Sequence, residues 1–215
     1  MLILKTLRCG LVLAATAVCA LPALAATYTL DDLVNGSVNS FQSDDGLLTF
    51  SDFSVTKLKK LSGNLSLYTV TTVSDGYVLS SSAFDASSGG LKRLNITYKV
   101  TANSGLITGA SMAMDATRTT GRIKVEKDIE DPTSDEGTFL LTLMRNNSSL
   151  LSDSDTFSPG AASFEVEEAI RIKKVSTLNS VQNSYTVTVP EPPVLSLMAA
   201  GLSGLVWLGR RPKRA

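Results

Sequence analysis

Hydrophobic and polar residues alternate with a period of two along several stretches of this chain. In one stretch Leu94, Ile96, Tyr98 and Val100 are separated by polar residues, and a similar alternation runs through residues 122–126, 139–143 and 185–189. In a β-strand, successive side chains point to opposite faces, so this period predicts strands with one buried and one solvated face.

The longest alternating stretch covers residues 164–172, where apolar residues share one parity and charged residues take the other. Glu168 breaks the pattern, and we expect a β-bulge or a strand end near it. Most aromatic residues, including Phe50, Tyr98, Phe139 and Phe164, fall at the parity that predicts burial in a core.

Turn-forming sequences separate these stretches. Examples are Asp44-Asp45-Gly46, Ser74-Asp75-Gly76, Asn103-Ser104-Gly105 and Ser158-Pro159-Gly160. Their frequency divides residues 26–189 into about nine short strands, which predicts an all-β fold with a single β-sandwich or jelly-roll-like domain. One short helical turn is expected at residues 29–34, with Thr29 as its cap, Asp32 three residues on, and Asn35-Gly36 at its end.

The N-terminal residues 1–25 have the pattern of a secretory signal peptide. Lys5 and Arg8 precede a short apolar run, and the small residues Ala23 and Ala25 fit the positions that signal peptidase inspects. We therefore expect export by the Sec machinery and cleavage after Ala25. A permanent N-terminal anchor is the alternative, but the run is short for one. Cleavage would remove both cysteines, Cys9 and Cys19, leaving a mature chain without disulfides.

The formal net charge of zero hides an uneven distribution. Residues 26–189 keep 14 of the 20 basic residues and 19 of the 20 acidic residues, a net charge of −5. An acidic body argues against nucleic acid as a partner and against anionic membrane surfaces.

Several kinds of catalytic chemistry are absent from the sequence. There is no histidine, which excludes Ser-His-Asp catalysis and imidazole metal sites. Ser54 and Lys57 match an S-x-x-K pattern, but they follow a stretch that reads as a strand rather than a helix. We expect no enzymatic activity, and a glycosidase with two carboxylates is the remaining enzymatic alternative, because spatial separation cannot be read from sequence.

An acidic cluster near residue 130 is the one candidate metal site. Its five carboxylates belong to Asp128, Glu130, Asp131, Asp135 and Glu136. Oxygen-rich loops suit extracellular Ca²⁺, although this spacing does not match an EF-hand. The competing interpretation is a solvated hairpin tip whose charge prevents edge-to-edge pairing. Apart from calcium, no cofactor is indicated.

The C-terminal residues 190–215 contain a short apolar run followed by basic residues. The run at 194–208 would be about 22 Å long as a helix, against about 30 Å for a bilayer core. The cluster that contains Arg210 and Arg211 would stay in the cytoplasm by the positive-inside rule, which places the body outside.

Val189-Pro190-Glu191-Pro192, the short apolar run and Arg210-Arg211 follow one another in the order of a PEP-CTERM sorting signal, and the tail resembles that family. The resemblance implies a Gram-negative, exopolysaccharide-producing host. It also implies a short transmembrane sorting helix that an exosortase recognises and cleaves at the membrane. Residues 27–33 and 48–54 more loosely resemble the sandwich domains that accompany this signal.

Together these features predict an exported structural or adhesive protein of the cell surface or the extracellular matrix, associated with exopolysaccharide. The alternative from another class is a Ca²⁺-dependent polysaccharide-binding module that uses the loop from residue 128 to residue 136. A glycosidase is the third alternative.

Overall fold

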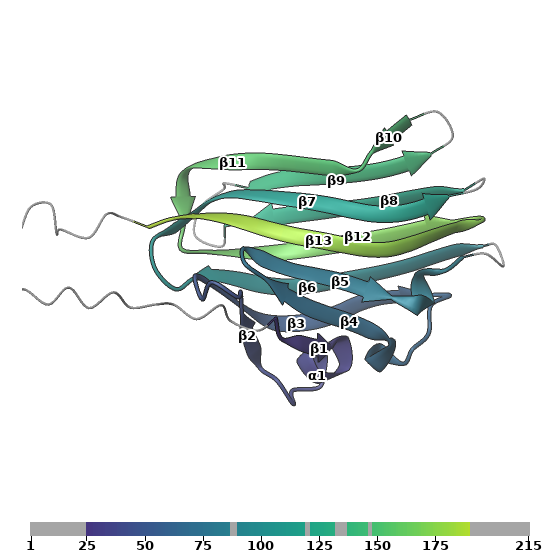
Figure 1. Cartoon of the computed structure of the whole chain (residues 1–215), viewed down its shortest axis with the longest axis horizontal. Coiled ribbons are helices and arrows are strands. Elements are labelled where there is room, and N and C mark those ends of the chain that lie inside the picture. Colours follow the sequence, from purple (N-terminus) through teal and green to yellow (C-terminus); the bar gives the residue numbers. More distant parts are fainter. Residues whose placement is uncertain (1–24, 87–89, 119–120, 132–136, 146–147, 190–215) are drawn as a thin grey trace, which may run out of the picture.

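The computed structural model describes residues 25–189 except 87–89, 119–120, 132–136 and 146–147. Within this range, thirteen strands form two antiparallel sheets that lie face to face, with the strands along the long axis of the molecule (Figure 1). The expected all-β sandwich is therefore confirmed. The strands outnumber the nine expected, partly because β1, β2 and β10 have only three residues each, which is too short for an alternation to be recognised.

Each sheet mixes strands that are distant in sequence. The six-stranded sheet has the order β1 (Thr27–Thr29), β4 (Tyr68–Val73), β5 (Gly76–Ser81), β13 (Ser176–Thr188), β7 (Leu106–Arg118) and β11 (Ser152–Ala161). The seven-stranded sheet has the order β10 (Ser148–Leu150), β9 (Gly137–Arg145), β8 (Arg122–Glu130), β12 (Ser163–Lys173), β6 (Leu91–Ala102), β3 (Leu48–Lys59) and β2 (Ser40–Gln42).

The core lies between the sheets and consists largely of the side chains that the alternation predicted to be buried. On β6, Leu94, Ile96, Tyr98 and Val100 are all buried. Aromatic rings fill one end of the core, where the centroid of Phe53 lies 5.2 Å from that of Tyr98.

A short helix, α1 (Leu30–Val34), joins β1 to the rest of the fold as expected. The Thr29 hydroxyl accepts a hydrogen bond from the Asp32 backbone N–H, and the Asp32 carboxylate accepts one from the Thr29 backbone N–H. Gly36 follows with φ +82°, a conformation that favours glycine. Two 3₁₀ turns, η1 (Leu65–Leu67) and η2 (Ser82–Phe84), complete the elements of the described residues.

The expected irregularity near Glu168 is wrong. Strand β12 pairs with β6 and with β8 in one continuous register from end to end. Glu168 keeps the parity of its apolar neighbours Val166 and Ile170 and is completely buried. The pattern breaks because a charged side chain occupies a core position, not because the strand bends.

The turn between β4 and β5 brings the chain close to β13. A Cβ added at Gly76 would lie 1.8 Å from the backbone carbonyl oxygen of Asn183, so only glycine allows this approach. The absence of a side chain at Gly76 therefore allows the start of β5 to lie against the backbone of β13.

Candidate functional site

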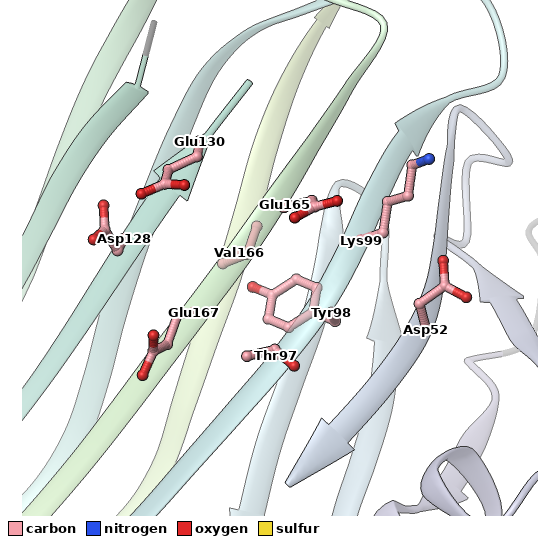
Figure 2. A pocket seen from close by; sticks show the side chains of 9 residues that line it. All are labelled: Asp52, Thr97, Tyr98, Lys99, Asp128, Glu130, Glu165, Val166 and Glu167. Atoms are coloured by element: carbon pink, nitrogen blue, oxygen red, sulfur yellow. The ribbon is translucent and has the colours of Figure 1, made fainter. Parts of the chain in front are cut away.

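A groove of about 460 Å³ crosses the outer face of the seven-stranded sheet. Figure 2 shows its lining side chains on four neighbouring strands, β8, β12, β6 and β3. The residues that line it are Asp52, Thr97, Tyr98, Lys99, Asp128, Glu130, Glu165, Val166 and Glu167. Tyr98 and Val166 are buried residues of the core, so they belong to the floor of the groove.

The strand register concentrates carboxylates in this groove. Glu165 on β12 lies opposite Glu130 on one side and opposite Lys99 on the other. One pair further along the strands, Glu167 lies opposite Asp128. Like charges directly opposite one another destabilise a sheet. Two such pairs side by side therefore lower the stability of the fold. Charges that cost stability are expected where they bind a ligand.

A β-bulge brings an additional carboxylate to the groove. The register of β3 against β6 shifts between Ser51 and Ser54, and Asp52 within this bulge has φ 57°. A bulge bends its strand and redirects a side chain. Asp52 consequently lines the groove on its β3 side (Figure 2).

Most charged groups of the groove are available to a ligand. Among the described residues, the side chains of Lys99, Glu165, Asp128 and Glu130 make no hydrogen bond or ion pair. Glu167 and Asp52 are exceptions. Glu167 Oε1 accepts a hydrogen bond of 2.8 Å from Asn95 Nδ2, and Asp52 Oδ2 accepts one of 3.0 Å from the Ser51 hydroxyl.

The opposite end of the same face shows a contrasting arrangement. Arg171 Nη1 lies 2.8 Å from Glu126 Oε2, and Lys124 also pairs with the Glu126 carboxylate. Arg93 Nε donates to Asn95 Oδ1 at 2.8 Å. At this end the charged side chains form ion pairs with one another, whereas most charged side chains of the groove do not.

An exposed aromatic ring stands beside the carboxylates, where the sequence predicted a buried one. Phe139 on β9 is 52% exposed and lies opposite Asp128. The parity expected for β9 is therefore wrong: Leu140 and Thr142 are buried, whereas Leu141 and Leu143 are only half-buried. Periodicity finds the two faces of a strand, but on β9 both faces carry leucines, and periodicity cannot tell which one faces the core.

The expected calcium ligands are only partly within the described residues. Asp128 and Glu130 point outward from β8 and line the groove, and Asp131 directly follows that strand. Asp135 and Glu136 lie outside the described residues. In the part of the chain that the structure describes, no group of three or more acidic side chains is arranged to hold a metal ion. Calcium binding stays a prediction.

Most of the expected processing signals lie beyond the described range. Val189 is the last described residue and is 44% exposed. Pro190, Glu191, Pro192, Arg210, Arg211 and Ala23 fall outside, as does the apolar run at 194–208. Residues 25–189, so far as they are described, contain no helix that is long and apolar enough to span a membrane.

A second polar cluster, buried between the sheets, was missed from the sequence. We call Lys127, Glu168 and Asn183 the buried triad, and each is 0% exposed. Asn183 Nδ2 donates to Glu168 Oε2 at 2.9 Å, and Lys127 Nζ lies 4.8 Å from the ring centroid of Tyr185. The Tyr185 and Tyr98 hydroxyl groups are hydrogen-bonded at 2.8 Å beside them.

Burial dominates the electrostatics of the triad. It lowers the pKa of Lys127 to about 8, against the opposing effect of the Glu168 charge. It also raises the pKa of Glu168, although Lys127 and the hydrogen bond from Asn183 act in the other direction. Both shifts favour the uncharged forms. A signal was present in the sequence, since each triad residue stands at the core parity of its strand.

No protein-family model matches the chain, and no curated protein matches it. Among solved structures it is similar to the enzymatically active domain of tailspike protein 4 from bacteriophage CBA120, at 14% identity and a TM-score of 0.28, over 73% of this chain and 21% of that one. The chain thus spans about a fifth of the tailspike chain.

Two further similarities concern shorter proteins. The family 12 xyloglucanase from Bacillus licheniformis matches at 9% identity and a TM-score of 0.32, over 78% of this chain and 100% of that chain. A variant of a family 29 carbohydrate-binding module matches at 16% identity and a TM-score of 0.22, over 61% and 91% of the two chains. At these scores the likenesses carry no conclusion about function.

Proposed function

We propose that this chain is an exported, non-catalytic protein of the cell surface or extracellular matrix that binds polysaccharide on the outer face of its seven-stranded sheet. One observation carries the proposal: unpaired Lys99, Glu165 and Asp128 line an open groove beside the exposed ring of Phe139. An aromatic face suits the apolar face of a sugar ring, and carboxylates and ammonium groups suit its hydroxyls.

The shape and charge of the groove favour a particular class of ligand. The groove is open and runs across four strands, which fits an extended chain rather than a small molecule. Its five carboxylates outnumber its single lysine, so it would repel an acidic polysaccharide. The expected ligand is therefore a neutral polysaccharide.

Exposure of the carboxylates favours binding over catalysis. The general acid of a glycosidase is usually a carboxyl group in a desolvated pocket. Here Asp128, Glu130, Glu165 and Glu167 are all exposed on a face open to water. We accordingly propose no enzymatic role.

Calcium-dependent binding is the second candidate. Asp128 and Glu130 both line the groove and both belong to the acidic cluster predicted to take Ca²⁺. An ion there would relieve the repulsion between Glu130 and Glu165, which lie opposite each other.

Titration calorimetry of the purified full chain with neutral polysaccharides tests the proposal. Phe139→Ser should weaken binding about fivefold, since an aromatic contact contributes about 1 kcal/mol. Leu67→Ser is the matched control, because Leu67 is 41% exposed but lines a pocket over β4, β5 and β13 of the other sheet. Equal affinity of Phe139→Ser and the unmodified chain would contradict the proposal, as would the absence of any binding. Chelation of Ca²⁺ should abolish binding only if the second candidate holds.

We further propose that the C-terminal tail is a processed sorting signal. Its support is the resemblance of Val189-Pro190-Glu191-Pro192, with the apolar run and Arg210-Arg211, to the PEP-CTERM pattern. An exosortase would be the partner of this tail, and signal peptidase and the Sec machinery would be the partners of the N-terminus. The body would then reach the surface or matrix where polysaccharide is available.

A further inference from the structure

The buried triad joins the two sheets. Lys127 on β8 and Glu168 on β12 lie directly opposite each other in the seven-stranded sheet, and both point into the core. Asn183 belongs to β13 of the six-stranded sheet and reaches Glu168 with a hydrogen bond of 2.9 Å. The carboxyl group of Glu168 therefore lies between an amine from its own sheet and a carboxamide from the facing one.

Lys127 extends across the core toward the strand that carries Asn183. Its Nζ lies 3.5 Å from the carbonyl oxygen of Ser111 on β7, a residue paired with Ser184 on β13. It also lies over the ring of Tyr185, two residues along β13 from Asn183. The amine has thus crossed from its own sheet to the backbone of the other.

The triad is poorly satisfied as a purely structural network. Among the described residues, Lys127 forms no ion pair within 4.0 Å, and its one hydrogen bond is long. Glu168 Oε1, Asn183 Oδ1 and the neighbouring Tyr77 hydroxyl are buried without a partner in hydrogen-bond geometry, although Tyr77 and Glu168 are near enough to shift each other's pKa. Buried polar groups are normally paired, so several orphans in one place indicate a role other than stability.

We propose that Lys127 and Asn183 react to form an intramolecular amide cross-link between β8 and β13, with Glu168 carrying the protons. An uncharged lysine is a nucleophile, and desolvation is what makes a lysine uncharged. The same desolvation raises the pKa of the Glu168 carboxyl group, which favours the protonated form that can act as an acid.

The step balances without an oxidant or a co-reactant. The lone pair of Lys127 Nζ attacks Asn183 Cγ while Glu168 gives a proton to Oδ1 and then accepts one from Nζ. Glu168 next protonates Nδ2, the Cγ–Nδ2 bond breaks, and ammonia leaves. Oδ1 returns its proton to Glu168 as the carbonyl re-forms. Amine and carboxamide have become a secondary amide and ammonia.

The hydrogen bond in the structure needs one change to fit this scheme. Asn183 now donates Nδ2 to Glu168, whereas the reaction needs Oδ1 to accept from the protonated carboxyl group. A half-turn of the carboxamide exchanges the two atoms, which are nearly identical in size. That turn would also give Asn183 Oδ1, now unpaired, a donor.

Such an amide would give the body a covalent cross-link, which it cannot obtain from a disulfide. The only two cysteines are Cys9 and Cys19, so the described body has no means of forming a disulfide. An amide between residues 127 and 183 would close a long loop across the two sheets and restrict the unfolded chain as a disulfide does. Unlike a disulfide, it would resist reduction.

Tryptic digestion and mass spectrometry of the purified full chain test the proposal. Trypsin cannot cleave after an acylated lysine, so the cross-linked protein should yield peptide 125–145, uncut after Lys127, joined to the peptide that starts at Val175. The joined mass should be lower than the sum of the two peptides by one ammonia. Two linear peptides with cleavage after Lys127 would overturn the proposal.

Variants test the role of each residue. Glu168→Gln keeps the shape and hydrogen bonding of the side chain but cannot carry a proton, so the branched peptide should disappear while circular dichroism still shows a β fold. Lys127→Met and Asn183→Leu should also abolish it. The matched controls Glu167→Gln and Asn179→Ala, exposed neighbours on β12 and β13, should retain it. A branched peptide that persists in Glu168→Gln would overturn the role of Glu168.

Discussion

Lys127 and Glu168 occupy positions that apolar side chains hold in the neighbouring pairs of β8 and β12. Val125 and Ile129 flank the lysine, Val166 and Ile170 flank the glutamate, and all four are buried. Removing two charges from water costs several kcal/mol each, and this cost is recovered only with close pairing. Their retention in the core is understandable if they react there once the two sheets have come together, as the proposed cross-link requires.

The destabilising effect of the buried lysine can be measured separately from any cross-link. Glu168→Leu leaves Lys127 without its counter-charge, whereas Lys127→Leu/Glu168→Leu replaces both, and neither variant has the acid that the cross-link needs. The double variant should be more stable by about 3 kcal/mol, because a buried lysine without a partner either carries a buried charge or must give up its proton, and both cost free energy. Urea denaturation at neutral pH measures the difference. Equal stabilities would show that the lysine is not held in the core.

For single residues, the alternation of the sequence predicted burial correctly in some strands and wrongly in others. Alternation correctly placed Leu94, Ile96, Tyr98 and Val100 in the core. It was wrong for Phe139 because both faces of β9 carry apolar residues. It was also wrong about Glu168, since a charged residue at a core parity looks the same as a bulge. Only the facing sheet, which brings Asn183 to Glu168, distinguishes the two.

Helix α1 shows that local chemistry can identify the ends of an element, although its Leu30 and Leu33 also pack into the core. The Thr29 cap, its reciprocal partner Asp32 and the terminating Gly36 were all readable from the sequence, and all three have the expected geometry. These interactions span only a few residues, so no knowledge of the tertiary fold was needed. By contrast, the strands β1, β2 and β10 exist only because longer strands offer an edge.

The cap should make stability depend on pH in acid. Hydrogen bonds from Thr29 hold the pKa of the Asp32 carboxyl below its usual 3.8. A lowered folded-state pKa means that the contribution is complete above 3.8 and is lost as the pH falls through the folded value. Thr29→Val should therefore lower stability at neutral pH and weaken the acid dependence.

Denaturant unfolding at a series of pH values below 5 checks this expectation. Thr27→Val is the matched control, because Thr27 is an exposed residue of β1 outside the cap. If the two variants lost stability equally at every pH, the cap would not be the cause.

On the scale of the whole molecule, the structure confirms the predicted fold of the body, whereas the tail lies outside the described residues. Two antiparallel sheets confirm the fold predicted from alternation and turns, since both signals are local and repeated many times. The groove could not be predicted, because it joins side chains from β3, β6, β8 and β12, whose order depends on pairing between distant segments. The sorting signal stays a prediction of the sequence.

That prediction can be tested on the exported protein. Cleavage of the tail should leave a C-terminus near residues 190–193 and remove Trp207, the single tryptophan. Mass spectrometry of the C-terminal peptide of surface protein from the native host measures the position of this C-terminus directly. Glu191→Ala should leave uncleaved protein in the membrane, whereas Thr186→Ala, an exposed change on β13, should be processed normally. Surface protein that still contains Trp207 would contradict the prediction.

The position of β13 has a mechanical consequence. β13 lies between β5 and β7 inside the six-stranded sheet, and it is the strand that leads directly to the tail (Figure 1). Any tension that enters the body from residue 189 runs along this strand. Hydrogen bonds of an antiparallel ladder lie perpendicular to the strands, so such a pull loads many of them together in shear. A pull perpendicular to the strand would instead break these bonds one at a time. A body anchored through β13 should therefore resist unfolding when a force pulls on its C-terminal end along this strand.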